Sequence, residues 1–168
     1  MLNWSESETH NGWARWLWLS LLVIVLDQWS KTTVVQYFAL HPPILMLTSW
    51  FNLVLAYNRG AAFSLFADNS ELPRILFSAL AIVAGILIIA SLRSQVKRPY
   101  ASAGLALILG GAMGNLIDRI RIGAVVDFIQ WHWADVYYWP AFNIADSAIT
   151  LGALVLVIVS LQPSGMRE

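Results

Sequence analysis

The run ILFSALAIVAGILIIASL, at residues 75–92, lies between Arg74 and Arg93 and contains no charged residue. A helix needs about 20 mostly apolar residues to cross the roughly 30 Å hydrocarbon core of a bilayer, so this run predicts a transmembrane helix. The whole chain of 168 residues is 58% hydrophobic and only 12% charged. Soluble domains carry about 25% charged residues, so the composition also indicates an integral membrane protein.

Three further apolar segments predict three more spans, at about residues 14–37, 99–119 and 145–163. The segment at 14–37 is interrupted by Asp27 and Lys31. No internal repeat and no linker divides the chain. We therefore expect residues 1–168 to form a single integral membrane domain, an all-α membrane protein with four transmembrane helices.

The two longer connections, residues 38–74 and 120–144, predict a small platform outside the membrane. SWFNLVLAYN at residues 49–58 and VVDFIQWHW at residues 125–133 are rich in β-branched and aromatic residues, which is typical of strands. We expect this platform to be partly strand and partly short helix.

The short connection between the second and third spans holds Arg93, Lys97 and Arg98, so it is expected to be cytoplasmic. An even number of spans then places both termini in the cytoplasm and the platform on the outer face. The orientation rests mainly on this one loop.

Several classes of function are disfavoured by composition. The chain has no cysteine, which excludes disulfides, thiolate metal sites and a cysteine nucleophile. The formal net charge is zero, so a nucleic-acid partner is not expected. His10, His41 and His132 have no metal-ligand spacing, so no metal or other cofactor is expected. A serine-lysine dyad has little support, because Lys31 is the only lysine in a span.

Polar residues recur at helical spacing near the predicted outer end of three spans. Asp27 and Lys31 are four residues apart, Asn115 is followed by Asp118 and Arg119, and Asn143 precedes Asp146 by three residues. Each set therefore shares one face of its helix. Ionisable groups inside a bilayer are costly and usually mark function, so we expect these polar faces to meet.

Each set also has a simpler interpretation. Asp27 with Lys31 could be a neutralised pair that makes the first span tolerable, Asp118 could belong to an interfacial charge cluster, and Asp146 could be favoured by a helix dipole. Two neighbouring carboxylates in a low dielectric share one proton, which is the chemistry of aspartic proteases. The residues alone leave Asp27, Asp118, Asp127 and Asp146 as candidates and do not select the pair.

The chain resembles the bacterial lipoprotein signal peptidases, also called signal peptidase II. The resemblance extends from residue 27 to residue 146 and rests on five stretches in order. They are Asp27-Gln28 with Lys31, YNRGAAF at 57–63, GGAMGNLIDR at 110–119, GAVVDF at 123–128 and PAFNIAD at 140–146.

The resemblance implies an aspartic endopeptidase of the bacterial inner membrane. Its substrates would be prolipoproteins, cut on the N-terminal side of a diacylglyceryl-modified cysteine, and its inhibitor would be the cyclic peptide globomycin. The active site would lie near the periplasmic face, in contact with membrane lipid. The catalytic pair carried over is Asp127 and Asp146.

The resemblance assigns supporting and substrate-binding roles to further residues. They are Asn58, Asn115, Arg119, Asn143 and Asp27, and we add Lys31 from the first motif. We also expect Gly60 to act as a hinge for the platform, because glycine tolerates conformations that other residues avoid.

Two other classes of function remain open. Intramembrane charges also mark proton-coupled carriers, although these usually place their sites at the midplane between inverted repeats. A non-catalytic assembly protein could use the same polar faces to hold helices together. Such a scaffold would tolerate Asp→Asn substitutions, whereas an aspartic peptidase would not.

Overall fold

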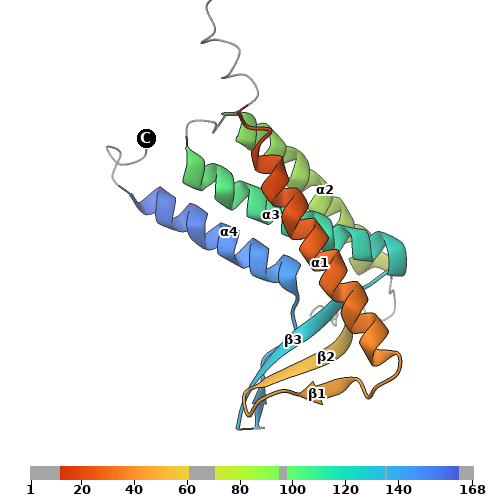
Figure 1. Ribbon diagram of the computed structural model, residues 1–168. Helices are drawn as coiled ribbons and strands as arrows, with labels where there is room; N and C mark the ends of the chain where they lie inside the picture. The colour runs from red at the N-terminus through yellow and green to blue at the C-terminus, as the bar shows by residue number, and fades with distance from the viewer. Residues whose placement is uncertain (1–11, 61–70, 95–97, 135, 163–168) are drawn as a thin grey trace, which may run out of the picture.

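The computed structural model describes residues 12–60, 71–94, 98–134 and 136–162. Four helices form a bundle, and a small sheet lies at one end of it (Figure 1). We call this the sheet end. In chain order the elements are α1 (Trp16–Phe38), β1 (Ile44–Met46), β2 (Phe51–Asn58), α2 (Glu71–Ser94), α3 (Pro99–Ile122), β3 (Val125–Trp133), β4 (Tyr137–Tyr138) and α4 (Ile144–Leu161).

Three helices among the described residues, α2, α3 and α4, are long and apolar enough to cross a membrane. They confirm three of the predicted spans. Helix α1 has 23 residues, enough for about 35 Å at 1.5 Å per residue, but it carries Asp27 and Lys31 in its middle. Its role as a fourth span stays a prediction. Its outward face is nevertheless apolar, with Trp18 and Trp29 largely exposed.

Helix α3 packs against α1 on one side and α4 on the other, and small residues let the backbones approach. A Cβ atom added to Gly110 would lie 2.7 Å from the Cβ of Val23 on α1. A Cβ added to Gly152 of α4 would lie 2.8 Å from the Ile108 side chain on α3. Real Cβ atoms do not come this close, so glycine at these two positions allows the helices to pack tightly.

The sheet is antiparallel, with the strand order β1-β2-β3-β4. Strands β2 and β3 confirm the two predicted strands, and Ala56 pairs with Asp127 across them. The short strands β1 and β4 were not predicted. Val34 and Phe38 of α1 pack with Phe128 of β3 in one buried cluster, which fixes the sheet against the bundle. The platform segment 61–70 lies outside the described residues.

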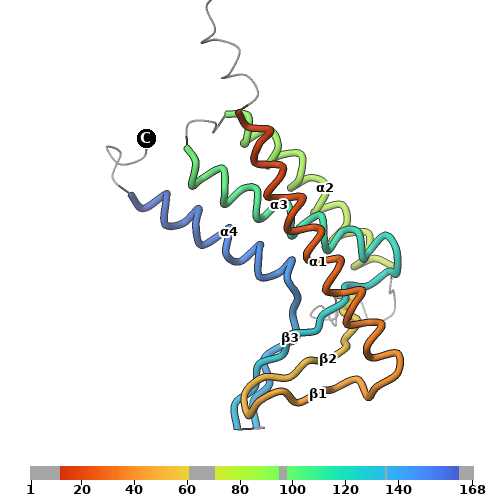
Figure 2. The backbone as a smooth tube through the Cα atoms, in the orientation of Figure 1, coloured from red at the N-terminus to blue at the C-terminus, as the bar shows by residue number. Residues whose placement is uncertain are grey.

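Helix α1 begins and helix α4 ends at the bundle end away from the sheet (Figure 2). That both termini lie on one side of the membrane, and which compartment that side faces, stay predictions.

Candidate active site

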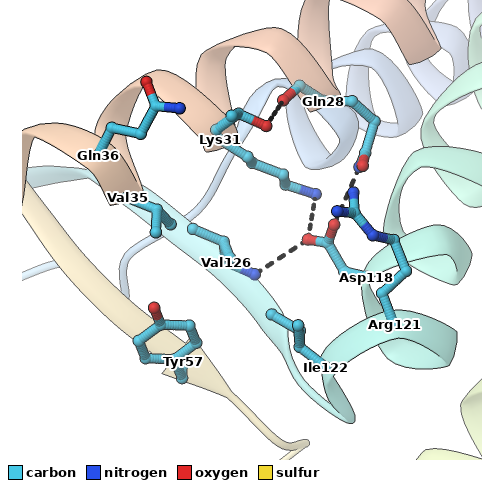
Figure 3. A pocket seen from close by; sticks show the side chains of 10 residues that line it. Gln28, Lys31, Val35, Gln36, Tyr57, Asp118, Arg121, Ile122 and Val126 are labelled. Carbon is cyan, nitrogen blue, oxygen red and sulfur yellow. Dashed lines mark hydrogen bonds and ion pairs between the residues drawn. The ribbon is translucent and has the colours of Figure 1, made fainter. Parts of the chain in front are cut away.

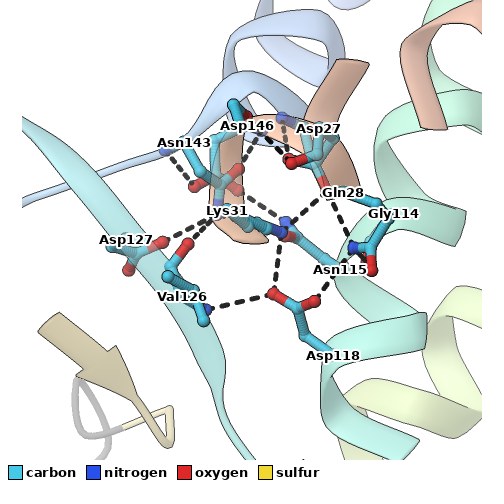
Figure 4. Close-up of polar contacts among 12 residues, drawn as sticks. Asp27, Gln28, Lys31, Gly114, Asn115, Asp118, Val126, Asp127, Asn143 and Asp146 are labelled. Atoms are coloured by element: carbon cyan, nitrogen blue, oxygen red, sulfur yellow. Dashed lines mark hydrogen bonds and ion pairs between the residues drawn. The ribbon is translucent and has the colours of Figure 1, made fainter. Parts of the chain in front are cut away.

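Polar side chains from four elements meet where the sheet joins the bundle (Figure 4). Helix α1 contributes Asp27 and Lys31, α3 contributes Asn115, β3 contributes Asp127, and α4 contributes Asp146. The predicted polar faces therefore do point at one another. The site consists of two linked clusters, one around Asn143 and one around Lys31.

Asn143 joins the two predicted catalytic carboxylates. As the N-cap of α4, its side chain accepts a hydrogen bond from the Asp146 N–H at 2.9 Å, and Asp146 Oδ2 accepts one from the Asn143 N–H at 3.3 Å. This reciprocal pair is a capping box. The remaining donor, Asn143 Nδ2, lies 2.7 Å from Asp127 Oδ1. One asparagine thus holds both carboxylates beside each other.

Asp127 is only 2% exposed and lies in the middle of β3. Its Oδ2 accepts a hydrogen bond from Asn58 Nδ2 at 3.0 Å. Burial raises the pKa of Asp127 from 3.8 to about 6, although the hydrogen bond from Asn58 acts in the opposite direction; the charge of Asp146 adds to the rise, and Asn143 and Lys31 oppose it. The site therefore raises the pH up to which this carboxyl group keeps its proton, to about 6.

The chain turn at Gly60 fixes the side chain of Asn58. Its Oδ1 accepts a hydrogen bond from the Gly60 N–H at 2.9 Å. Gly60 has a φ of +85°, a conformation that side chains with a Cβ rarely adopt. Gly60 thus directs the Asn58 amide toward Asp127. Whether it also acts as a hinge stays a prediction.

Asp146 is oriented from α3. Its Oδ1 accepts a hydrogen bond from Asn115 Nδ2 at 2.8 Å. Asn115 Oδ1 is occupied by two donors, Lys31 Nζ at 2.9 Å and Asn143 Nδ2 at 3.2 Å. Because both donors require the amide oxygen, the amide nitrogen of Asn115 must face Asp146.

Lys31 is the centre of the second cluster. It is 3% exposed, and its Nζ lies 2.8 Å from both Asp27 Oδ2 and Asp118 Oδ2. Each of these carboxylates also accepts a hydrogen bond from a backbone N–H group. Ala145 donates to Asp27 at 2.9 Å, and Val126 donates to Asp118 at 3.1 Å. The ion pair of Asp27 with Lys31 within α1 is therefore present, and it also links α1 to α3, α4 and β3.

The predicted site gave no role to Gln28, and none to Asp118 although Asp118 was one of the four candidate carboxylates. Gln28 Nε2 donates to Asp118 Oδ1 at 2.9 Å and to the Gly114 carbonyl at 3.1 Å. Asp118 is 5% exposed, so it is not part of an interfacial charge cluster. The i,i+3 spacing from Asn115 placed Asp118 on the correct face, and Gln28 stood in the first quoted motif. Their mutual contact depends on the packing of α1 against α3.

Arg119 lies at the edge of the site. Its guanidinium stacks over the Phe77 ring of α2, with 5.2 Å to the ring centroid, and donates to the Asn115 carbonyl at 3.4 Å. It interacts electrostatically with Asp146 and Asp127. Among the described residues, no hydrogen bond joins its side chain to either carboxylate.

A separate cavity of about 310 Å³ opens beside the Lys31 cluster (Figure 3). It lies between α1, the last turn of α3 and the β2–β3 pair, and Thr32, Val35, Tyr57 and Ile122 are among its lining residues. Neither Asp127 nor Asp146 lines it. We call this cavity the α1 groove. In the part of the chain that the structure describes, no group of three or more acidic or histidine side chains could hold a metal ion.

Comparisons with known proteins agree on one family. The family model described as signal peptidase (SPase) II matches residues 19–162. A lipoprotein signal peptidase from Pseudomonas fluorescens is 47% identical over 144 residues, covering 85% of each chain. One from Tolumonas auensis is 45% identical, covering 86% of this chain and 88% of its own.

The fold has solved relatives as well. A structure described as "Bacterial membrane enzyme structure by the in meso method at 2.3 A resolution" has a TM-score of 0.76 and 25% sequence identity to this chain. The similarity covers 92% of this chain and 93% of that one. With a family model that spans most of its length and relatives at this identity, the chain belongs to the signal peptidase II family.

Proposed function

We propose that this protein is an intramembrane aspartic endopeptidase that removes signal peptides from prolipoproteins. The relatives are named lipoprotein signal peptidases, and this proposal transfers their printed activity to this chain. The bond cut is the one on the N-terminal side of the diacylglyceryl-modified cysteine. The observation that carries the aspartic mechanism is the attachment of Asp127 and Asp146 to the single residue Asn143.

In the proposed reaction the two carboxylates have different roles. Asp127, whose pKa is raised to about 6 mainly by burial, donates its proton to the scissile carbonyl oxygen. Asp146 takes a proton from a water molecule, whose oxygen attacks the carbonyl carbon. The tetrahedral intermediate then collapses: the C–N bond breaks as the proton held by Asp146 passes to the leaving amine, and a hydroxyl group of the intermediate returns a proton to Asp127. Water is consumed, and a carboxylic acid and an amine result.

The surrounding amides act on the geometry of the pair. Asn58 and Asn143 fix the two oxygens of Asp127, and Asn115 fixes Oδ1 of Asp146. We propose that Arg119 stabilises the negative charge that develops during attack, since its charge lies near both carboxylates. The buried groups Asp27 and Lys31 support the site from behind and do not contact substrate.

The proposed setting is the bacterial inner membrane, with four spans, both termini cytoplasmic and the carboxylates near the periplasmic face. The substrate's acyl chains would lie in the outer leaflet of this membrane, so its scissile bond would lie at the depth where the sheet meets the helices. The enzyme then does not need to extract its substrate from the bilayer. Globomycin would inhibit by competing for this site.

Cleavage of a diacylglyceryl-modified prolipoprotein by the purified protein tests this function. Both Asp127→Asn and Asp146→Asn should abolish turnover, because an amide cannot exchange the proton. Thermal unfolding must show that each variant is folded. A folded variant with near-normal turnover would contradict the dyad and would favour a scaffold, which tolerates this nearly isosteric change.

A further inference from the structure

Three arginines surround a second cavity at the sheet end. Arg59 follows β2, Arg74 lies in the first turn of α2, and Arg121 lies in the last turn of α3. The cavity has a volume of about 350 Å³ and its lining is mainly polar. Glu71 is the one carboxylate among the described lining residues. Among these described residues, three positive charges against one negative charge make this cavity, the arginine pocket, suited to an anion.

Two of the three guanidinium groups have no side-chain partner among the described residues. Arg74 is engaged, because it pairs with Glu71 at 3.2 Å and donates to the Arg119 carbonyl at 3.0 Å. Arg59 and Arg121 are exposed, and neither has a hydrogen-bond or ion-pair partner among the described side chains. A guanidinium presents several N–H donors in one plane, which matches the oxygens of a phosphate group.

The arginine pocket adjoins the α1 groove. Arg121 and Ile122 line both cavities, and Figure 3 labels both at the edge of the groove. The groove has a mainly apolar lining, and the charges at its floor, Lys31 and Asp118, form an ion pair. A polar cationic cavity thus adjoins an apolar one, which fits an amphiphile with an anionic head.

The arginine pocket also borders an outward-facing apolar surface on α2 and α3. Apolar side chains of α2 and α3 begin within one turn of the arginines, and they point outward. Their exposed fractions are 60% for Ile75, 53% for Leu76 and 62% for Ile120. Cationic side chains at the border of such a belt meet the phosphates of the membrane surface.

We propose that the arginine pocket and the α1 groove together bind one anionic glycerophospholipid. Its phosphate lies against Arg59 and Arg121, and an acyl chain occupies the groove beside Thr32 and Val35. A diacylglyceryl-cysteine carries no phosphate, so this site is distinct from the one where the substrate is cut. A free phosphate ion would leave the apolar half of the site empty, which is why a lipid is the occupant.

Lipid binding to the delipidated protein in a neutral detergent tests this proposal. Dioleoyl phosphatidylglycerol is titrated, and bound lipid is counted by native mass spectrometry. One tightly bound molecule is expected, and the Arg59→Gln/Arg121→Gln double variant should weaken it about 10- to 30-fold. The Arg93→Gln/Arg98→Gln double variant, at the opposite end of the bundle, makes the same charge change and should leave the affinity within about twofold.

Two matched variants of α1 test the role of the α1 groove. Thr32 and Thr33 are consecutive, exposed residues of α1, and each hydroxyl donates to the carbonyl four residues earlier. Only Thr32 lines the groove. Thr32→Trp should therefore fill the groove and weaken lipid binding at least about fivefold, whereas Thr33→Trp should leave it unchanged.

Four results would overturn the proposal. Equal binding of the lipid by the double arginine variant would remove the head site, and equal loss in the two tryptophan variants would remove the groove. Displacement of the lipid by glycerol 3-phosphate at similar concentration, or equal affinity for dioleoyl phosphatidylcholine, would show that acyl chain or charge is not recognised. Because no step uses a prolipoprotein, these results are independent of whether the chain cleaves one.

Discussion

Two clusters of aspartates lie side by side in this protein, and different groups contact the carboxylates of each cluster. Asp27 and Asp118 share the ammonium group of Lys31, which lies 2.8 Å from each. Asp127 and Asp146 receive hydrogen bonds from asparagine amides instead. Asp27 and Asp118 therefore share a cation, whereas the hydrogen-bond donors at Asp127 and Asp146 carry no charge.

The comparison also separates structural from chemical roles. The Lys31 cluster reaches the backbone of β3 through Val126 and that of α4 through Ala145. These two residues directly precede Asp127 and Asp146 in the chain. The Lys31 cluster therefore positions the backbone that carries the proposed reactive pair, Asp127 and Asp146.

The largest effect is expected from removing a proposed reactive carboxylate. Asp127→Asn and Asp146→Asn should each lower turnover of a lipid-modified prolipoprotein at least about 1,000-fold, as losses of essential catalytic groups do. The melting temperature should change little, because Asn keeps the size and much of the hydrogen bonding. Single-turnover cleavage assays measure the loss, and residual activity above about a tenth would break the distinction between the clusters.

A large loss of stability is expected when Lys31 is removed. Lys31→Met leaves Asp27 and Asp118 buried without a cation, and breaking such a pair costs about 3–5 kcal/mol. Thermal unfolding in detergent measures this. The triple variant Asp27→Asn/Lys31→Met/Asp118→Asn removes the uncompensated charges and should recover most of the loss. No recovery would mean that Lys31 stabilises through something other than these two carboxylates.

A smaller effect is expected at the junction of the clusters. Asn115→Ala removes the donor to Asp146 and the acceptor for Lys31. We expect kcat to fall about 10- to 100-fold with little change in KM, since Asn115 orients a reacting group and does not bind substrate. Steady-state kinetics separate the two constants. Unchanged cleavage would show that Asp146 does not depend on this amide.

The smallest effect is a shift in pH dependence. The proposed acid is active while Asp127 is protonated, so kcat/KM should fall as pH rises through its pKa of about 6. The hydrogen bond from Asn58 lowers this pKa, because it stabilises the carboxylate. Asn58→Ala removes that bond, so the pKa rises and the alkaline limb should move to higher pH. A shift to lower pH in the measured profile would contradict the assignment.

Local pattern was sufficient for much of the fold. Long uncharged runs predicted α2, α3 and α4, and β-branched and aromatic runs predicted β2 and β3, because these signals depend on neighbouring residues only. The short strands β1 and β4 carry no such signal. Their three and two residues are extended because they hydrogen-bond to β2 and β3.

Which residues share each polar helix face was also predictable. The spacing of Asp27 with Lys31, and of Asn115 with Asp118, follows from helix geometry. Which face meets which was not predictable, since that depends on how closely α1 and α3 pack. Gly114 allows this contact, because a Cβ there would lie 2.6 Å from Asp27 Oδ2.

By itself the sequence determined the membrane character, the helices, strands β2 and β3, and the family, because composition, periodicity or ordered motifs indicate each of them. Only the tertiary structure decided how four aspartates, three of them buried and Asp146 half-buried, divide into an ion-paired group and an amide-bound group. The reason is that the state of a carboxylate depends on the donors within about 3 Å of it. At Asp127 and Asp146 those donors include Asn58 and Asn115, which arrive from distant parts of the chain.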